Sequence, residues 1–162
     1  MTTSKRDKKF IQHCIELSKE SLAQGNKPFG ALVTQHDTII AQAGNDNKTK
    51  IYHHAELMAL EKAVEKLKTR DLSSCTLYSN VEPCPMCAFM IREYKIKRVV
   101  FSLISPFMGG YTKWPILQDK ELGKRINYST PPIVRSSVLV REAHKILANT
   151  PLATEFGKKQ KI

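Results

Sequence analysis

One histidine, one acid and two cysteines in this sequence are spaced as a metal site would need them. The segment HHAELMALEKA contains His54 and, two residues later, Glu56, and the segment EPCPMC contains Cys84 and Cys87. An imidazole nitrogen and two thiolates are ligands that suit Zn²⁺, and three protein ligands leave a fourth position open, as in catalytic zinc sites. Glu56 would then be free to exchange a proton with a water in that fourth position.

Each of these features alone has an ordinary explanation. A His-x-Glu pattern occurs by chance in many proteins, and Glu56 could be an acid that favours the start of a helix. A C-x-x-C pair could be a redox pair or half of a structural zinc site. A structural site needs a second pair of ligands, whereas Cys14 and Cys75 have no suitable spacing and are predicted to be core residues. A structural zinc would have no use for a proton carrier, so Glu56 favours a catalytic site.

The sequence places these residues at the starts of two helices. Apolar residues at helical spacing predict a helix from His54 to about residue 68, and Pro83 and Pro85 open a second, short helix that contains CAFMIREY. The strand CTLYSN lies between them. A helix N-terminus favours thiolate over thiol, so both sulfurs of the C-x-x-C pair could reach one ion there.

The other elements complete an α/β pattern. The remaining predictions are a helix over 7–23, a hairpin of FGALVTQ and TIIAQAG, a strand RVVFSLI, one or two helical turns near 118–124, a strand IVRSSV and a helix LVREAHKILAN. The irregular stretch between RVVFSLI and IVRSSV is long enough to carry function or contacts between subunits. This order predicts a single domain over 1–162 with a mixed sheet covered by helices on both faces.

Composition limits the class of protein. No segment approaches twenty consecutive apolar residues, and the basic start MTTSKRDKKF leads into an amphipathic pattern, so we expect no membrane span, no secretion signal and a cytoplasmic location. Lys and Arg outnumber Asp and Glu by 26 to 15, which gives a net charge of +11. Such a surface favours nucleic acid, although the cations form no single stripe in the sequence and solubility alone could explain them.

The motifs resemble a known family. HAE followed by PCPMC matches the H-x-E…P-C-x-x-C pattern of zinc deaminases that act on nucleobases. The blocks KPFGALVTQHDTIIAQAGN, HAELMALEKA, CTLYSNVEPCPMCAFMI and IKRVVFS resemble, in order, the cytidine-deaminase-like superfamily over about residues 8–102. The branch is similar to tRNA adenosine deaminases, guanine deaminases and fungal-type cytosine deaminase. The resemblance implies a three-layer α/β/α sandwich with a five-stranded mixed sheet, and a zinc-dependent hydrolytic deaminase.

The resemblance also implies roles for individual residues. His54, Cys84 and Cys87 would bind Zn²⁺, and Glu56 would carry protons while an exocyclic amine of the base leaves as ammonia.

For the substrate, the family pattern implies that Asn45, or Asn47 as the alternative, hydrogen-bonds the base or sugar, and that Ala55 offers its backbone. Phe29 would be a pocket wall or an ordinary buried aromatic residue. Trp114 would cap the pocket or fill an interface.

The substrate prediction depends on a departure from the family. tRNA enzymes follow their fourth strand with a stretch like Asp-x-Lys-Thr-Gly, whereas this chain has SPFMGGYTKWP. We therefore expect a small-molecule nucleobase or nucleoside, such as guanine or cytosine, as the substrate, with a tRNA anticodon loop as the alternative and a non-enzymatic zinc module as a third possibility. Apolar residues on the motif helices and after Ser105, together with family habit, favour a homodimer.

Overall fold

The computed structural model describes residues 4–125 and 129–157. Its elements are α1 (Lys5–Ala23), β1 (Gly30–Gln35), β2 (Thr38–Gly44), α2 (Ala55–Leu67), β3 (Cys75–Val81), α3 (Pro85–Glu93), β4 (Arg98–Leu103), α4 (Leu122–Arg125), β5 (Ile133–Arg135), α5 (Val140–Leu147) and α6 (Ala153–Gly157). The order agrees with the sequence prediction, except that α6 was not predicted. In the described part of the chain, no helix is long and apolar enough to cross a membrane.

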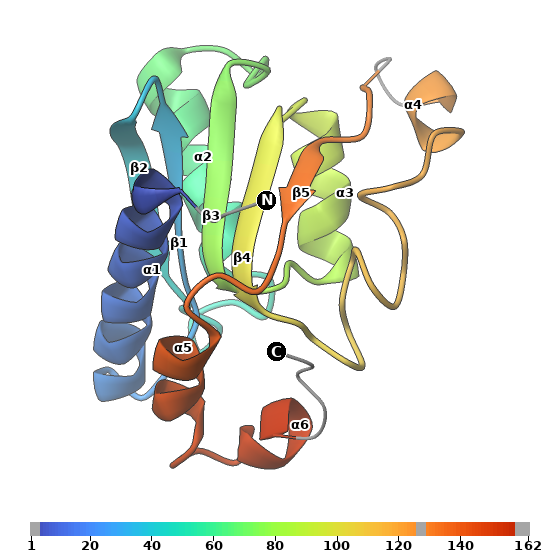
Figure 1. Cartoon of the computed structure of the whole chain (residues 1–162). Helices are drawn as coiled ribbons and strands as arrows, with labels where there is room; N and C mark the ends of the chain where they lie inside the picture. Colours follow the sequence, from blue (N-terminus) through green and yellow to red (C-terminus); the bar gives the residue numbers. More distant parts are fainter. Residues whose placement is uncertain (1–3, 126–128, 158–162) are drawn as a thin grey trace.

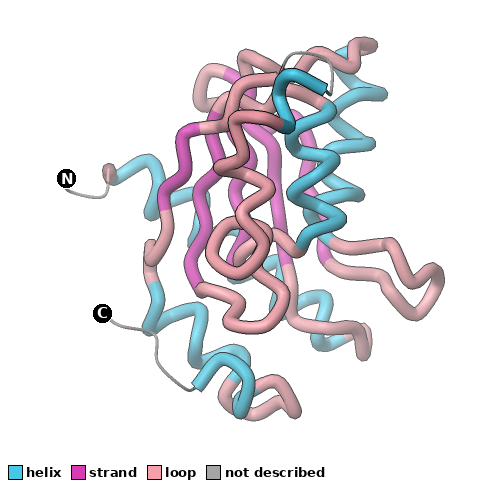
Figure 2. The backbone as a smooth tube through the Cα atoms, turned by 90° about the vertical axis from the view of Figure 1, so that its right-hand side faces the viewer, coloured by secondary structure: helices cyan, strands magenta, loops and turns pink. Residues whose placement is uncertain are grey.

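The strands form one mixed sheet in the order β2-β1-β3-β4-β5. β1 is antiparallel to both β2 and β3, while β3, β4 and β5 are parallel to one another. Helices α1 and α5 lie on one face of the sheet, and α2 and α3 lie on the other (Figure 1). Figure 2 shows the strands running between helices on both sides. The predicted three-layer α/β/α sandwich is therefore confirmed.

The sheet is buried on both faces because neighbouring residues of a strand point to opposite sides. In β1, Ala31 and Val33 pack into the core under α2 and α3, and Leu32 packs into the core under α1 and α5. Cys14 and Cys75 are both fully buried, as predicted for core residues.

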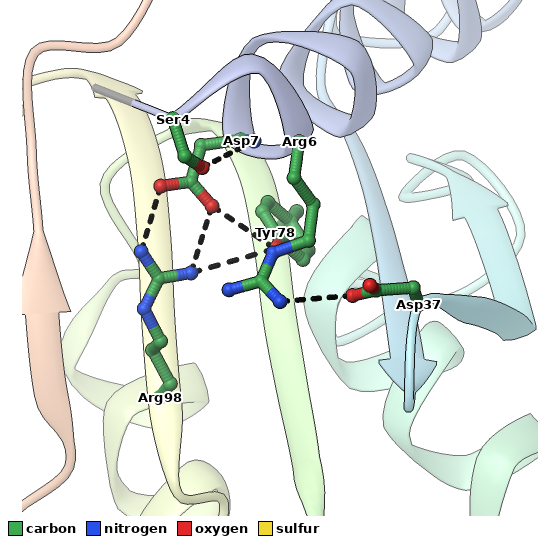
Figure 3. Close-up of polar contacts among 6 residues, drawn as sticks. All are labelled: Ser4, Arg6, Asp7, Asp37, Tyr78 and Arg98. Atoms are coloured by element: carbon green, nitrogen blue, oxygen red, sulfur yellow. Dashed lines mark hydrogen bonds and ion pairs between the residues drawn. The ribbon is translucent and has the colours of Figure 1, made fainter.

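A polar cluster ties α1 to the middle of β3 and to the start of β4. The Asp7 carboxylate accepts hydrogen bonds from Arg98 at 2.7 and 2.8 Å and from the Tyr78 hydroxyl at 3.1 Å (Figure 3). Ser4 caps α1 by accepting a hydrogen bond from the Asp7 amide. Burial alone would raise the pKa of Asp7, but the hydrogen bonds and charge of Arg98 outweigh it and hold that pKa below its usual value.

The last strand is shorter than predicted. IVRSSV was expected to be a strand, but β5 ends at Arg135. Ser137 and Leu139 have φ angles of 62° and 55°, in the left-handed region, which an extended strand does not use. The chain stays attached to β4 here, because the Ser137 amide donates to the Ser102 carbonyl at 3.1 Å.

The long stretch between β4 and β5 is anchored by one arginine. Arg92 of α3 is 1% exposed. Its guanidinium donates to the carbonyls of Ile116, Asp119 and Ser129 at 2.7, 2.8 and 2.9 Å, and to the Ser129 hydroxyl at 3.1 Å. Because backbone carbonyls of three separate residues converge on one cation, Ile116, Asp119 and Ser129 are held beside α3.

Candidate active site

The three expected zinc ligands lie at the starts of two helices. His54 is the residue immediately before α2, and Cys84 is the residue immediately before α3. Cys87 lies in the first turn of α3, where Pro85 occupies the position that needs no amide donor. The first amides of α2 and α3 donate no hydrogen bond to a capping side chain. These amides and the helix dipoles therefore favour negative charge on the nearby thiolates.

The distances between the ligand atoms fit a tetrahedral zinc ion. His54 Nδ1 lies 3.4 Å from Cys84 Sγ and 3.7 Å from Cys87 Sγ, and the three atoms lie within 4.8 Å of one another. With usual Zn–S and Zn–N lengths, tetrahedral angles separate a nitrogen and a sulfur ligand by about 3.6 Å. The donors and their spacing therefore fit Zn²⁺.

Electrostatics at the cluster already favour a thiolate. A hydrogen bond from Cys87, followed by one from His54, lowers the pKa of Cys84 to about 4. The same bond and burial raise the pKa of Cys87, and the Cys84 thiolate raises that of His54. Cys84 is thus the thiol of the pair that most easily gives up its proton, as binding of a metal cation requires.

Glu56 lies beside this cluster as a buried carboxyl group without a basic partner. It is 5% exposed, accepts a hydrogen bond from the Ser79 hydroxyl at 2.9 Å, and lies 3.8 Å from the Cys87 sulfur, which donates to its other oxygen. Burial, followed by the charge of Cys84, raises the pKa of Glu56 to about 6. Such a raised carboxyl pKa in a cavity is typical of acid–base catalysts.

Ser79 was missed at the sequence level, although the pattern contained a signal for it. It lies two residues after Leu77 in β3, on the face that packs against α2 and α3, and it is fully buried. A small hydroxyl on the strand face that otherwise carries Cys75 and Leu77, and that faces the metal motif, could have been assigned to hold Glu56.

A cavity of about 620 Å³ opens at the cluster. Its lining includes His54, Glu56 and Cys84. Much of the remaining lining consists of apolar side chains from segments far apart in the sequence: Phe29, Ile51, Tyr52, Val81, Met86, Phe107, Met108, Leu152 and Phe156. The last two come from the region of α6, which the sequence did not reveal. An apolar cavity with a few polar groups at its base suits a planar heterocycle.

The four predicted substrate contacts lie in different settings. Phe29 lines the cavity, and Ala55 is the buried first residue of α2. Asn45 is buried. Its backbone amide donates a hydrogen bond to the carbonyl of Phe29 at 2.9 Å. The side chain of Asn45 donates to Asn47 at 2.6 Å, which brings the two alternatives together. Trp114 is 51% exposed and is not part of the cavity lining.

Comparison with known proteins agrees with this geometry. The family model for the cytidine and deoxycytidylate deaminase zinc-binding region matches residues 4–103. The chain belongs to this family. With the three ligands in place, it is a zinc-dependent deaminase, a hydrolase that acts on C–N bonds of nucleobases.

Individual relatives differ in how much of the chain they match. A tRNA-specific adenosine deaminase of Bacillus subtilis is 31% identical over 159 residues, which cover 96% of this chain and 94% of that protein. The guanine deaminase of the same organism is 34% identical over 96 residues, or 57% of this chain and 62% of that one. A structure from a study of A-to-I editing by tRNA:A34 deaminases has a TM-score of 0.78 at 24% identity and covers 86% of this chain and 99% of its own.

Proposed function

We propose that this deaminase acts on an adenosine in a tRNA anticodon loop. The observation that carries the proposal is the extent of the match. The sequence similarity to the tRNA-specific enzyme of Bacillus subtilis spans nearly the whole chain, including the part after β4, whereas that to the guanine deaminase of the same organism spans little more than half. The part after β4 supplies Phe107, Met108, Leu152 and Phe156 to the cavity, so a match there bears on the substrate.

The charged and apolar rim of the cavity supports an RNA substrate. Lys27 lies at the rim, and Lys50 packs over the ring of Tyr52 at 5.7 Å from its centre. Ile51 and Phe107, also in the lining, are 85% and 63% exposed. Aromatic and basic side chains together are the usual platform for unpaired nucleotides, and the net charge of +11 favours a polyanion.

The residues divide the chemistry between them. His54, Cys84 and Cys87 would hold the zinc, which when bound supplies a water activated for attack. Glu56 accepts the proton of the attacking water and returns a proton to the departing amine, so that ammonia leaves and a carbonyl replaces it on the ring. Ser79 donates to one Glu56 oxygen and thereby leaves the other facing the cluster.

A free base is the second candidate, and one feature favours it. The segment SPFMGGYTKWP stands where the sequence pattern of tRNA enzymes has a polar stretch, and it places Phe107 and Met108 against the cavity. For this reason the sequence alone favoured a small substrate such as guanine or cytosine. The comparisons support the tRNA alternative better, because two tRNA-specific adenosine deaminases at 30% and 31% identity match 86% and 96% of the chain, whereas the curated cytosine and guanine deaminases match 57–64% of it.

Turnover of a substrate panel tests the proposal. Product formation is measured with an adenosine-containing anticodon stem-loop, the same loop with guanosine at that position, free adenosine, guanine and cytosine, with Glu56→Gln as the inactive control. We expect the adenosine loop to react fastest, with kcat/KM falling steeply as salt rises because phosphate contacts release counterions. Faster turnover of guanine or cytosine than of the loop would refute the proposal.

The homodimer stays a prediction. Phe89 on α3 and Trp114 are 39% and 51% exposed, which suits a contact between subunits. Light scattering should give about twice the chain mass of 18.4 kDa, and a single species at the chain mass would contradict the prediction.

A further inference from the structure

Glu82, two residues before Cys84, holds the segment that follows β4. Its side chain is buried, with the residue 3% exposed. The amides of Tyr111 and Thr112 donate to Oε1 at 3.0 and 2.7 Å, and the amide of Ser105 donates to Oε2 at 2.9 Å. The Thr112 hydroxyl lies 3.0 and 2.9 Å from the two oxygens. One carboxylate therefore gathers donors from both ends of the stretch 105–112.

These contacts occupy both oxygens of Glu82. Three backbone amides and a hydroxyl already converge on them, so little capacity remains to bind a substrate or exchange a proton. Glu82 lines the cavity, but its bonds point into the protein. Its role is to position other residues rather than to react.

Two glycines let the segment come this close. The Gly110 amide donates to the carbonyl of Pro83 at 2.8 Å. A Cβ atom on Gly109 would collide with the Glu82 carboxylate, and one on Gly110 would collide with Ala88 of α3. The segment is thus seated directly on the turn that carries the zinc ligand Cys84.

The positioned segment presents two apolar side chains at the cavity. Phe107 and Met108 are 63% and 56% exposed and both line it. Side chains that are exposed to this degree receive little support from packing, so their place depends on the backbone that carries them. That backbone is fixed at Ser105 on one side and at Tyr111 and Thr112 on the other, all through Glu82.

We propose that Glu82 is a positioning residue for substrate selection, which fixes Phe107 and Met108 as a wall of the cavity relative to the zinc ligands. The inference rests on the proposed function in one respect, namely that the cavity receives the base. It differs from a purely structural role, in which Glu82 would support the stability of the whole domain without affecting how substrate binds.

The first measurement needs no substrate. Hydrogen–deuterium exchange is followed by mass spectrometry in the zinc-loaded protein and in Glu82→Gln, where an amide group replaces one acceptor oxygen with a donor. Peptides covering 105–112 should exchange about ten-fold faster or more, since hydrogen bonds to a charged group are lost. Zinc content and exchange in α2 should stay unchanged. Glu121→Gln is the matched control, because it changes an exposed acid that, among the described residues, forms its ion pair with Lys124, and it should behave as wild type.

The second measurement is a double-mutant cycle on kcat and KM for the best substrate of the panel. Phe107→Ala removes the wall, and Glu82→Gln releases it, so both should raise KM while kcat falls less. The double variant should be little worse than the single ones, because the two changes act through the same contact. Additive effects would overturn the proposal.

The exchange result decides independently of the activity. Unchanged exchange in 105–112, or faster exchange spread evenly over the domain, would overturn the positioning role even if the enzyme deaminates RNA. If no RNA is deaminated, the proposed function fails while local acceleration still supports the positioning role. Should Glu82→Gln not fold, Thr112→Val removes one donor and should accelerate the same peptides by a smaller factor; no acceleration would overturn the proposal.

Discussion

Two buried carboxyl groups, Asp7 and Glu56, lie toward opposite ends of the parallel strands in contrasting surroundings. Asp7 is joined to Arg98 by two hydrogen bonds of 2.7 and 2.8 Å, and its pKa is lowered. Glu56 has a hydroxyl and a thiol as neighbours, and its pKa is raised to about 6. Burial alone would raise both pKa values, so the difference comes from the partner.

The contrast separates a structural use of a buried acid from a chemical one. A carboxylate with a paired guanidinium is fixed in its charged form and holds elements together. A carboxyl group that is hydrogen-bonded only to a hydroxyl and a thiol is not fixed in one charge state by an arginine, so it can change its protonation at little cost, which is what proton transfer requires. We therefore expect substitutions near Glu56 to affect activity with little effect on stability, and substitutions near Asp7 to have the reverse effect.

Removal of a metal ligand should have the largest effect. Cys84→Ser should lose zinc and all measurable deamination, because the two remaining ligands cannot hold the ion in its catalytic geometry. Cys75→Ser, at a fully buried cysteine away from the cluster, should keep zinc at one per chain. Metal analysis of both purified variants checks this, and equal loss of zinc in both would make the ligand assignment wrong.

Glu56→Gln should lower turnover by about 10²–10⁴-fold, the usual range for general acid–base catalysis. The variant should keep its zinc and its urea midpoint, because no ion pair is broken. Kinetics, metal analysis and unfolding are measured side by side, with Glu61→Gln on the exposed face of the same helix as control. Turnover above a tenth of wild type, far outside that range, would contradict the role.

Arg98→Met should have the opposite effect to Glu56→Gln, with lower stability and unchanged turnover. The substitution leaves Asp7 buried without its cation. Loss of one partner from a buried pair costs about 3–5 kcal/mol. We expect a loss of about 3 kcal/mol, at the lower end of this range, because the Arg98 side chain is 18% exposed to solvent. Urea unfolding measures the loss, while zinc content and turnover should stay near wild type.

The exposed Arg6–Asp37 pair beside this cluster supplies the control (Figure 3). Its side chains are 50% and 63% exposed, so Arg6→Met should change stability by less than about 1 kcal/mol. If Arg98→Met proved no more destabilising than Arg6→Met, the Asp7–Arg98 pair would not be a structural brace.

Acid should weaken the Asp7 contribution with a defined sign. The pKa of Asp7 is lower in the folded chain than its unfolded value of about 3.9. Its stabilising effect is therefore complete above the unfolded pKa and is lost as pH falls through the folded pKa. The difference in unfolding free energy between wild type and Asp7→Asn should stay constant from neutral pH to about 5 and shrink below about 4. A difference that grew toward acid pH would contradict the assignment.

Tyr78→Phe should have a smaller effect than Arg98→Met. It removes the 3.1 Å hydrogen bond from the hydroxyl to Asp7 but keeps the ring, whose centre lies 5.0 Å from that of Phe10. The expected cost is about 1 kcal/mol in urea unfolding, with unchanged turnover. A loss as large as that of Arg98→Met would show that the hydroxyl, and not the cation, holds Asp7.

The features that the sequence predicted are those encoded in short stretches. Helical and strand periodicity located the sheet and most helices, and the metal ligands followed from two motifs of a few residues each. Glu82 and Arg92 were missed because their partners are mostly backbone amides and carbonyls of a distant irregular stretch, and any residue type carries those groups. The contribution of Phe156 was missed because it depends on how the chain returns to the cavity after α5.

The Asp7–Arg98 pair also bears on the order in which the molecule is made. Its partners are 91 positions apart, and Arg98 begins the fourth strand. At a typical synthesis rate of 5–20 residues per second, the cation is added roughly 5–20 s after the acid. During that interval the first helix can form and touch the first hairpin, but its N-terminal turn has no cation to hold it. The ion pair at this turn can therefore form only after the fourth strand has been synthesised, which is later than the first helix and the first hairpin.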